Sequence, residues 1–144
     1  MVLRADYADG REYNEALATE FRANGGVTTG DWEGKRLLII TTTGSKSGNE
    51  HMTPLGFSMD GDRYVISAAN GGAPKHPAWY HNLVANPIVT VEVGPETFQA
   101  RAIVSEGADR DRLVVERSKS NPAFIRNQER AGSRQIPLVW LERI

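Results

Sequence analysis

The first apolar pattern in the chain has the period of a helix. Within residues 9–24, apolar side chains recur at the i, i+3, i+4 and i+8 positions of one helical face, at Tyr13, Ala16, Leu17 and Phe21. Two adjacent glycines end this pattern, and the glycine- and threonine-rich residues 27–34 predict a linker. We therefore expect residues 1–34 to form a helix and linker that pack on a single domain formed by residues 35–144.

Short runs rich in β-branched residues and leucine predict the strands. They cover residues 35–43, 51–59, 63–69, 88–93, 98–104 and 136–141. Helical patterns occupy residues 77–85 and 108–118, and Pro122 starts a further short helix. Since most connections between the strands are too short for crossover helices, antiparallel pairing should dominate. The predicted fold is α+β, with about six mainly antiparallel strands in a small barrel-like sheet and helices packed outside.

Two local signals refine the predicted sheet. Pro54 removes one hydrogen-bond donor from the run 51–59, which indicates an edge strand or a bulge. Asp60 and Gly61 form a hairpin-turn signal, which predicts that this run pairs with residues 63–69.

A glycine-rich loop lies between the run 63–69 and the predicted helix 77–85. Gly71 and Gly72 permit left-handed backbone angles and a close approach of the backbone to a ligand. Lys75 and the free N–H groups at the helix start favour an anion, and Trp79 offers a flat surface for a ring. The alternative is a tight connection, with Trp79 in the core and Lys75 solvated.

A second lysine-bearing turn follows the run 35–43. Ser45, Lys46 and Ser47 lie between two glycines and can donate hydrogen bonds to a phosphate or carboxylate. The turn has lysine where a nucleophile elbow needs serine, and it lacks the GK[ST] order of a P-loop. A polar hairpin loop is the alternative. If the strands pair, Lys46 and Lys75 should bracket one anionic ligand.

Neither turn predicts a catalytic side chain. Both lack a nucleophile and a paired acid and base, so any chemistry should belong to a bound cofactor that the protein positions.

Composition limits the possible functions. The chain has 144 residues, which suits one domain of roughly 100–200 residues. A net charge of −1 argues against a nucleic-acid surface, and the lack of cysteine excludes disulfides and cysteine-based zinc sites. The three histidines lack the i, i+4 pairing around a glutamate that zinc hydrolases use, so no metal site is predicted.

Location and assembly are also constrained by the sequence. No run approaches the roughly 18 apolar residues of a membrane span, and the N-terminus lacks the apolar core of a signal peptide, which predicts a cytoplasmic protein. The mixed charges of the helix 9–24 favour packing on the domain, with peripheral membrane contact as the alternative. Exposed strand edges are compatible with a monomer or a homodimer.

Five sequence blocks in order resemble the deazaflavin-dependent nitroreductase family. They are TTTGSKSG at 41–48, TPL at 53–55, GGAPKHPAWYHNLVANP at 71–87, VEVG at 91–94 and IPLVWLER at 136–143. The resemblance implies a split β-barrel of the FMN-binding type that binds coenzyme F420. It also implies hydride transfer from the reduced coenzyme to electron-poor small molecules, namely quinones, nitroaromatics and activated enones or coumarin-type lactones.

The resemblance further implies a set of coenzyme contacts. Position by position, these are Ser45, Lys46, Ser47, His51, Met52, Thr53, Pro54, Leu55, Gly56, Ser67, Ala68, Ala69, Asn70, Ala78, Trp79, Tyr80, His81 and Asn82. Some relatives carry arginine at the positions of Ser45 and His51 and lysine at that of Asn70, so this chain brings fewer cations to the coenzyme's anionic tail. Phe124 and Asn127 occupy positions that line the acceptor pocket in relatives.

Two other functions suit the same residues. An FMN-dependent oxidoreductase is the alternative enzyme, because distant relatives of this barrel hold FMN. A carrier that binds the deazaflavin or a hydrophobic ring compound without turnover is the non-catalytic alternative.

Overall fold

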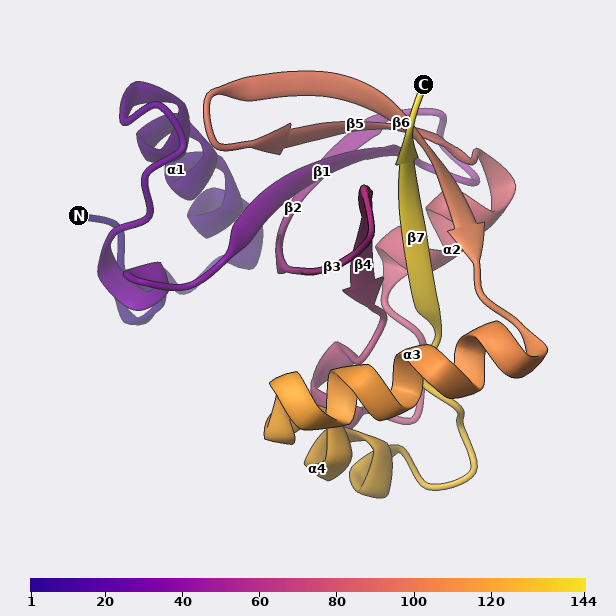
Figure 1. Cartoon of the computed structure of the whole chain (residues 1–144). Helices are drawn as coiled ribbons and strands as arrows, with labels where there is room; N and C mark the ends of the chain where they lie inside the picture. Colours follow the sequence, from indigo (N-terminus) through magenta and orange to yellow (C-terminus); the bar gives the residue numbers. More distant parts are fainter.

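A curled, seven-stranded antiparallel sheet organises the chain, and the computed structural model describes all of residues 1–144 (Figure 1). The strand order is β2-β1-β5-β6-β7-β4-β3. The strands are β1 Leu37–Thr43, β2 Glu50–Gly56, β3 Ser58–Asp60, β4 Arg63–Ser67, β5 Ile88–Val93, β6 Glu96–Val104 and β7 Leu138–Arg143. The α-helices are α1 Gly10–Ala23, α2 Ala78–Ala85, α3 Gly107–Ser120 and α4 Pro122–Ala131, and short 3-10 turns are η1 Arg4–Asp6, η2 Gly30–Trp32 and η3 Asn70–Gly72.

The sheet confirms the predicted class and differs from the prediction in one strand. Residues 51–59 were expected to form a single strand, but Phe57 interrupts them. β2 pairs with β1, whereas β3 pairs with β4 at the other end of the strand order. The chain thus passes from one edge of the sheet to the other at Phe57, which produces the seventh strand. Pro54 lies on the edge strand β2, as its missing N–H predicted.

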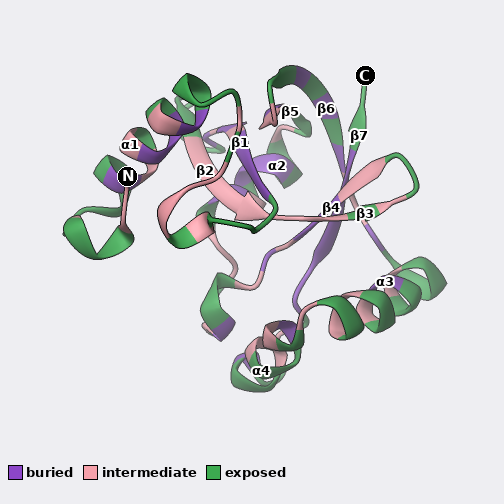
Figure 2. Ribbon diagram, turned by 60° about the vertical axis from the view of Figure 1, so that its left-hand side comes forward, coloured by how far each residue is buried: buried purple, intermediate pink, exposed green.

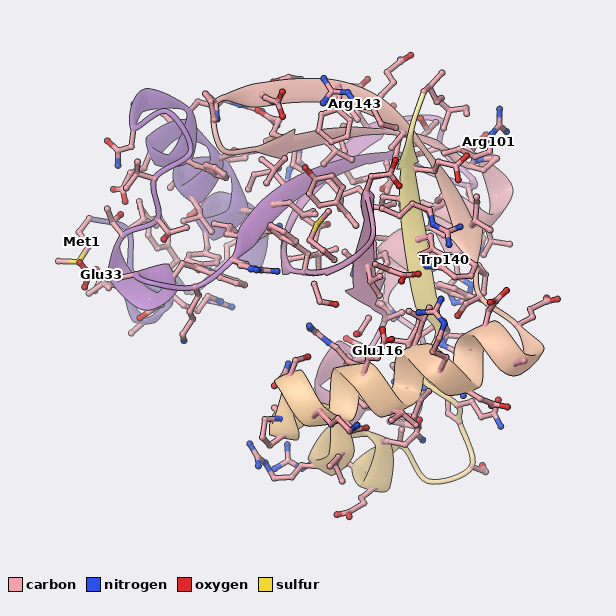
Figure 3. The ribbon with its side chains drawn as sticks, in the orientation of Figure 1. Met1, Glu33, Arg101, Glu116, Trp140 and Arg143 are labelled. Atoms are coloured by element: carbon pink, nitrogen blue, oxygen red, sulfur yellow. The ribbon has the colours of Figure 1, made fainter.

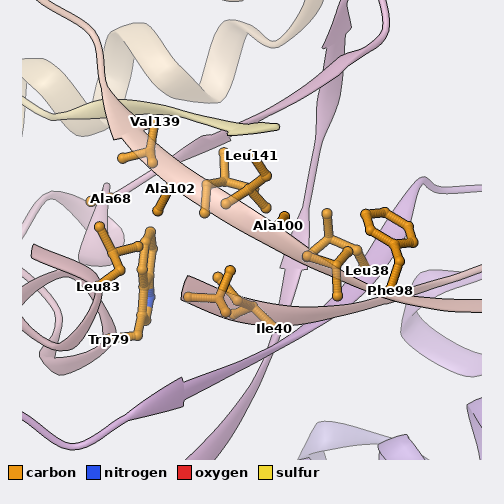
Figure 4. Close-up of a cluster of buried hydrophobic side chains, with 13 residues drawn as sticks. Leu38, Ile40, Ala68, Trp79, Leu83, Phe98, Ala100, Ala102, Val139 and Leu141 are labelled. Carbon is orange, nitrogen blue, oxygen red and sulfur yellow. The ribbon is translucent and has the colours of Figure 1, made fainter. Parts of the chain in front are cut away.

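The main core fills the inside of the curled sheet. It contains 13 buried residues, among them Leu38 and Ile40 of β1 and Leu141 of β7. Trp79 and Leu83 of α2 enter the same cluster, as Figure 4 shows. Burial of apolar side chains is the dominant favourable term in folding, so α2 is held against the sheet by its apolar side.

Helix α1 covers the outer face of β1. Successive side chains of a strand point to opposite faces, so Leu37 and Ile39 face away from the main core and pack with Leu17 and Phe21 of α1. Asp9 caps the helix by accepting hydrogen bonds from the backbone N–H groups of residues 11 and 12. Figure 2 shows buried residues along α1, whereas α3 is largely exposed.

Helices α3 and α4 cover a different part of the outer surface, next to β4 and β7 (Figure 1). Phe124 and Leu113 pack there with Trp140, which Figure 3 labels on β7. Asp60 accepts hydrogen bonds from Trp140 Nε1 at 2.9 Å and from both terminal nitrogens of Arg112 at 3.0 Å. These contacts, that with Arg112 foremost, hold the pKa of the Asp60 carboxyl below its usual value and tie α3 to the sheet. None of the helices combines the length and the apolar character that a membrane crossing requires.

Candidate functional site

A cleft of about 500 Å³ lies between the β1–β2 turn, the start of α2 and the exposed side of α1. Three structural segments that are distant in sequence therefore meet around it. The lining residues are Arg11, Asn14, Glu15, Gly44, Ser45, Lys46, Ser47, Glu50, His51, Met52, Thr53, Ala78, Trp79 and Asn82.

The β1–β2 turn is held by its own backbone. Gly44 N donates to the carbonyl of Asn49 at 2.7 Å, and Gly48 N donates to the carbonyl of Gly44 at 3.0 Å. Ser47 Oγ accepts from Asn49 N at 3.1 Å, which closes the turn further. This network presents Lys46 at the tip of a rigid turn, on the wall of the cleft.

Asn82 connects α2 to this turn. The side chain is buried, its Oδ1 accepts from Ser45 N at 3.1 Å, and its Nδ2 donates to Thr42 Oγ1 at 3.2 Å. Asn86 Nδ2, at the end of α2, also donates to the carbonyl of Thr43 at 3.3 Å, so two side-chain amides hold the helix against the end of β1 and the turn.

No side chain caps the start of α2, and Tyr80 N donates to the carbonyl of Pro77 at 3.1 Å. The backbone N–H groups of Ala78 and Trp79 are therefore the ones free to bind an anion.

Lys46 is the cation of the cleft best placed for an anion. Arg11 forms an ion pair with Glu15 at 3.3 Å, whereas Lys46 has no carboxylate partner. Glu50 also lines the cleft. The positive charge of the cleft is therefore confined to the surroundings of Lys46 and does not extend over the whole lining. The cleft suits a ligand with an anionic group near Lys46 and a larger uncharged part.

The wall formed by α1 was not predicted from the sequence. Arg11, Asn14 and Glu15 lie on the polar side of the predicted helix, and Asn14 Nδ2 donates to the carbonyl of Met52 at 3.3 Å. Gly44 and Glu50 also line the cleft and were not predicted. The sequence shows that polar residues recur on the side of this helix opposite its apolar face. That spacing does not show which strand the polar side borders.

The structure brings together nine of the predicted contact residues on the cleft. These are Ser45, Lys46, Ser47, His51, Met52, Thr53, Ala78, Trp79 and Asn82. The other predicted residues are not on its lining, namely Pro54, Leu55, Gly56, Ser67, Ala68, Ala69, Asn70, Gly71, Gly72, Lys75, Tyr80 and His81. Among these, Leu55 and Tyr80 pack on the main core, and Ala68 is fully buried within it.

The glycine loop has a different neighbour from the one predicted. Gly72 has a φ of +83°, and a Cβ there would lie 2.6 Å from Arg130 Cβ and 2.8 Å from the carbonyl oxygen of Asn127. The close approach that glycine permits is therefore to α4 and not to a ligand in the cleft. Lys75 is exposed and absent from the cleft lining, so Lys46 and Lys75 do not bracket the cleft.

Two aromatic side chains that were predicted to contact a ligand are largely buried in the protein core. Trp79 is 8% exposed and belongs to the main core, so only its margin reaches the cleft wall. The alternative interpretation, in which Trp79 is a core residue, describes most of its surface. Phe124 is 4% exposed within the core beneath α3 and α4, away from the cleft lining.

Arg134 holds the segment that leads into α2. Its guanidinium donates to the carbonyl oxygens of Ala68 at 3.1 Å, Ala69 at 2.7 Å and Ala73 at 3.0 Å. It also lies 2.9 Å from His76 Nδ1. Since a guanidinium can only donate, Nδ1 accepts, and the neutral imidazole carries its proton on Nε2.

His76 should make folding sensitive to acid. Burial lowers the pKa of His76 below its usual 6.5, and repulsion by Arg134 and His81 lowers it further. The unfolded chain then binds a proton at a higher pH than the folded chain, so the stability due to neutral His76 is complete above pH 6.5 and is lost as the pH falls through the lower, folded pKa.

We therefore expect His76→Gln, which keeps an acceptor for Arg134, to reduce the dependence of the unfolding free energy on pH. Urea titrations from about pH 7 to about pH 5 measure this dependence in the wild type and the variant. Identical pH profiles of the two proteins would show that His76 does not carry it.

Fold and cleft together define a small split-barrel protein with a site suited to an anionic ligand. The family model described as F420H(2)-dependent quinone reductase matches residues 14–143. The F420H(2)-dependent quinone reductase Rv1261c of Mycobacterium tuberculosis (strain ATCC 25618 / H37Rv) is 40% identical over 108 residues, which are 74% of this chain and 72% of the relative. The chain belongs to the F420H(2)-dependent quinone reductase family.

Solved structures agree with this assignment. One described as an F420-H2 dependent reductase (FDR-A) has a TM-score of 0.67 and 33% identity, with 74% of this chain and 94% of that chain covered. Another, described as a domain-swapped dimer, has a TM-score of 0.70 and 32% identity, with 92% and 96% covered. The predicted split β-barrel and the family resemblance are therefore confirmed.

Proposed function

We propose that this chain is a reductase that uses reduced coenzyme F420 to reduce a quinone-type small molecule. The proposal rests on one observation: the β1–β2 turn and the start of α2 both line the same cleft. The hydrogen bond from Ser45 N to Asn82 Oδ1 joins these two segments. Family membership supports the same coenzyme.

The residues on the cleft fit the anionic part of the coenzyme. Lys46 offers a charge without a carboxylate partner, and the free N–H groups of α2 offer hydrogen-bond donors at the same cleft. These donors support the predicted contacts at Ser45–Ser47.

The protein's own contribution is binding and orientation. When bound, the reduced coenzyme supplies the hydride. The Lys46 ammonium and the free N–H groups at the start of α2 would hold its charged tail, and the apolar margin of Trp79 and Met52 would restrict water at the cleft. Reduction of a quinone to a hydroquinone also consumes a proton, for which the cleft offers hydroxyl groups and solvent. No side chain is assigned as catalytic.

Two measurements test this function. Titration of the protein with F420 and with FMN, followed by tryptophan fluorescence, should show tighter binding of F420. Loss of reduced-coenzyme absorbance on addition of menadione should then require the protein. Tighter binding of FMN would favour the flavin enzyme, and F420 binding without turnover of menadione, a nitroaromatic or a coumarin would favour the carrier.

Lys46→Met should weaken F420 binding by about tenfold to a hundredfold. The reason is that a hydrogen bond to a charged group contributes about 1.5–3 kcal/mol, and each 1.4 kcal/mol is roughly tenfold in affinity. Lys119→Met is the control, because Lys119 is exposed on α3 and does not line the cleft. An unchanged dissociation constant for Lys46→Met would remove Lys46 from the site, and Lys75→Met tests whether the second lysine takes part.

A further inference from the structure

The tetrapeptide Ala-Asn-Gly-Gly occurs twice in the chain, at residues 23–26 and at residues 69–72. Asparagine is a chemically labile residue, and it loses its side-chain amide most readily before glycine. The reason is that glycine has no side chain to shield its backbone nitrogen, which attacks the Cγ carbon of the asparagine. The letters of the two copies are the same, so any difference in their reactivity must come from the fold.

The first copy lies at the end of α1, where its backbone is held. Asn24 is exposed, but Gly25 N, the nitrogen that would attack it, donates to the carbonyl of Arg22 at 3.2 Å. Gly26 is fixed as well, because a Cβ there would overlap the carbonyl group of Gly94. The attacking nitrogen must therefore give up a hydrogen bond before it reacts, in a segment that cannot move freely.

The second copy forms the turn η3, and its attacking nitrogen is free. Asn70 and Gly71 are both exposed, and the N–H group of Gly71 donates no hydrogen bond. A Cβ at Gly71 would have no atom within 4 Å, so there is open space beside this nitrogen. Asn70 Nδ2 donates to the carbonyl of Lys75 at 2.9 Å, a bond that water can replace at little cost because the side chain is exposed.

We propose that Asn70 is a site of spontaneous deamidation in the folded protein, whereas Asn24 is protected. Gly71 N attacks Asn70 Cγ, so that an N–Cγ bond forms and the Cγ–Nδ2 bond breaks. The amide leaves as ammonia and takes with it the proton that Gly71 N gives up. Water then opens the cyclic imide at either of its carbonyl groups, which yields aspartate or isoaspartate. No oxidant, reductant or coenzyme takes part, so the reaction is independent of the coenzyme cleft.

The products disturb the turn that they occupy. An ionised carboxylate cannot donate to the carbonyl of Lys75, so a favourable contact at 2.9 Å becomes a repulsive one. Isoaspartate also lengthens the backbone by one carbon beside Gly72, which packs closely on Asn127 and Arg130. The modified chain should therefore hold residues 70–76 less firmly against α4, and hydrogen exchange in this segment should become faster.

Incubation of the full chain in mildly alkaline buffer, followed by proteolysis and mass spectrometry of the peptides, tests the proposal. In the folded protein Asn70 should lose its amide at least fivefold faster than Asn24. In urea that unfolds the chain, the two rates should become similar, because the local sequence is the same. Equal rates in the folded protein, or faster loss at Asn24, would overturn the proposal. A fivefold difference that persists in urea would also overturn it, since the flanking sequence would then be the cause.

Gly71→Ala tests the attacking group, because a methyl group beside the nitrogen hinders closure of the imide ring. It should slow the loss of amide at Asn70 at least fivefold, and Gly25→Ala, the matched control, should leave Asn70 unchanged. A Cβ at either glycine has no atom within 4 Å, so both variants should fold, which circular dichroism checks. Isoaspartate is detected with a protein-isoaspartate methyltransferase and a labelled methyl donor. Labelling of Gly71→Ala as fast as that of the wild type would refute the role of the Gly71 nitrogen.

Discussion

Gly72→Ala is expected to destabilise the protein by about 2–5 kcal/mol. A left-handed backbone costs a residue with a Cβ roughly 1–2 kcal/mol, and forcing extra volume into a packed site costs about 1–3 kcal/mol more. Both costs apply at Gly72, where φ is +83° and the new Cβ would meet Arg130 Cβ at 2.6 Å and the Asn127 carbonyl at 2.8 Å. The second of these atoms belongs to the backbone of α4, so neither a rotamer change nor a small shift relieves the contact.

Gly71→Ala is the matched control. Gly71 also has a positive φ, of +64°, but a Cβ there has no atom within 4 Å. It should therefore cost only the backbone term, about 1–2 kcal/mol. Urea unfolding of both variants measures the difference. Equal losses would mean that the contact between η3 and α4 contributes nothing, and a larger loss in Gly71→Ala would contradict the packing described above.

The second large effect is expected from Arg134→Met, which should lower the unfolding free energy by about 3 kcal/mol. The change removes a guanidinium that donates to three carbonyl oxygens between Ala68 and Ala73, and acceptors left without a partner cost about 1–3 kcal/mol each when they are buried. Ala69 and Ala73 are only partly buried, so water recovers some of the loss there, whereas Ala68 is fully buried. Urea unfolding measures the total effect.

The same change should loosen the segment that leads into α2. Hydrogen exchange within residues 68–76 should become faster in Arg134→Met, because the side chain that ties this segment is lost. Arg126→Met is the control, since Arg126 is an exposed residue of α4 without a hydrogen-bonding or ionic partner. If exchange in residues 68–76 is unaltered while α4 itself becomes less protected, the role of Arg134 is confined to α4.

These two predictions concern a segment that the sequence suggested for ligand contact. Gly72 packs on α4, and the guanidinium of Arg134 donates hydrogen bonds to the carbonyl groups that follow β4. The segment holds α2 in position from behind, and through Asn82 the helix in turn holds the β1–β2 turn. Its effect on the coenzyme cleft is therefore expected to be indirect.

Local patterns in the sequence predicted the elements and one half of the cleft. Side-chain alternation and turn residues depend on only a few neighbouring positions. For this reason the local sequence predicted the strands, the edge position of Pro54 and the hairpin at Asp60. The turn that carries Lys46 was found for the same reason, because two glycines and two serines around a lysine already describe its chemistry. The family resemblance added the coenzyme.

Tertiary structure alone decided which faces meet. The period of α1 predicts that one side is apolar, but only its docking on β1 places Asn14 and Glu15 on the cleft. The same holds for Gly72 against α4 and for Trp79, which is buried in a cluster that includes residues from five strands of the sheet. Arg117 looks in the sequence like a solvated charge on a helix, and its buried, unpaired nitrogen arises only from the packing of α3. Contacts between distant segments depend on the whole fold, and no local window of sequence contains them.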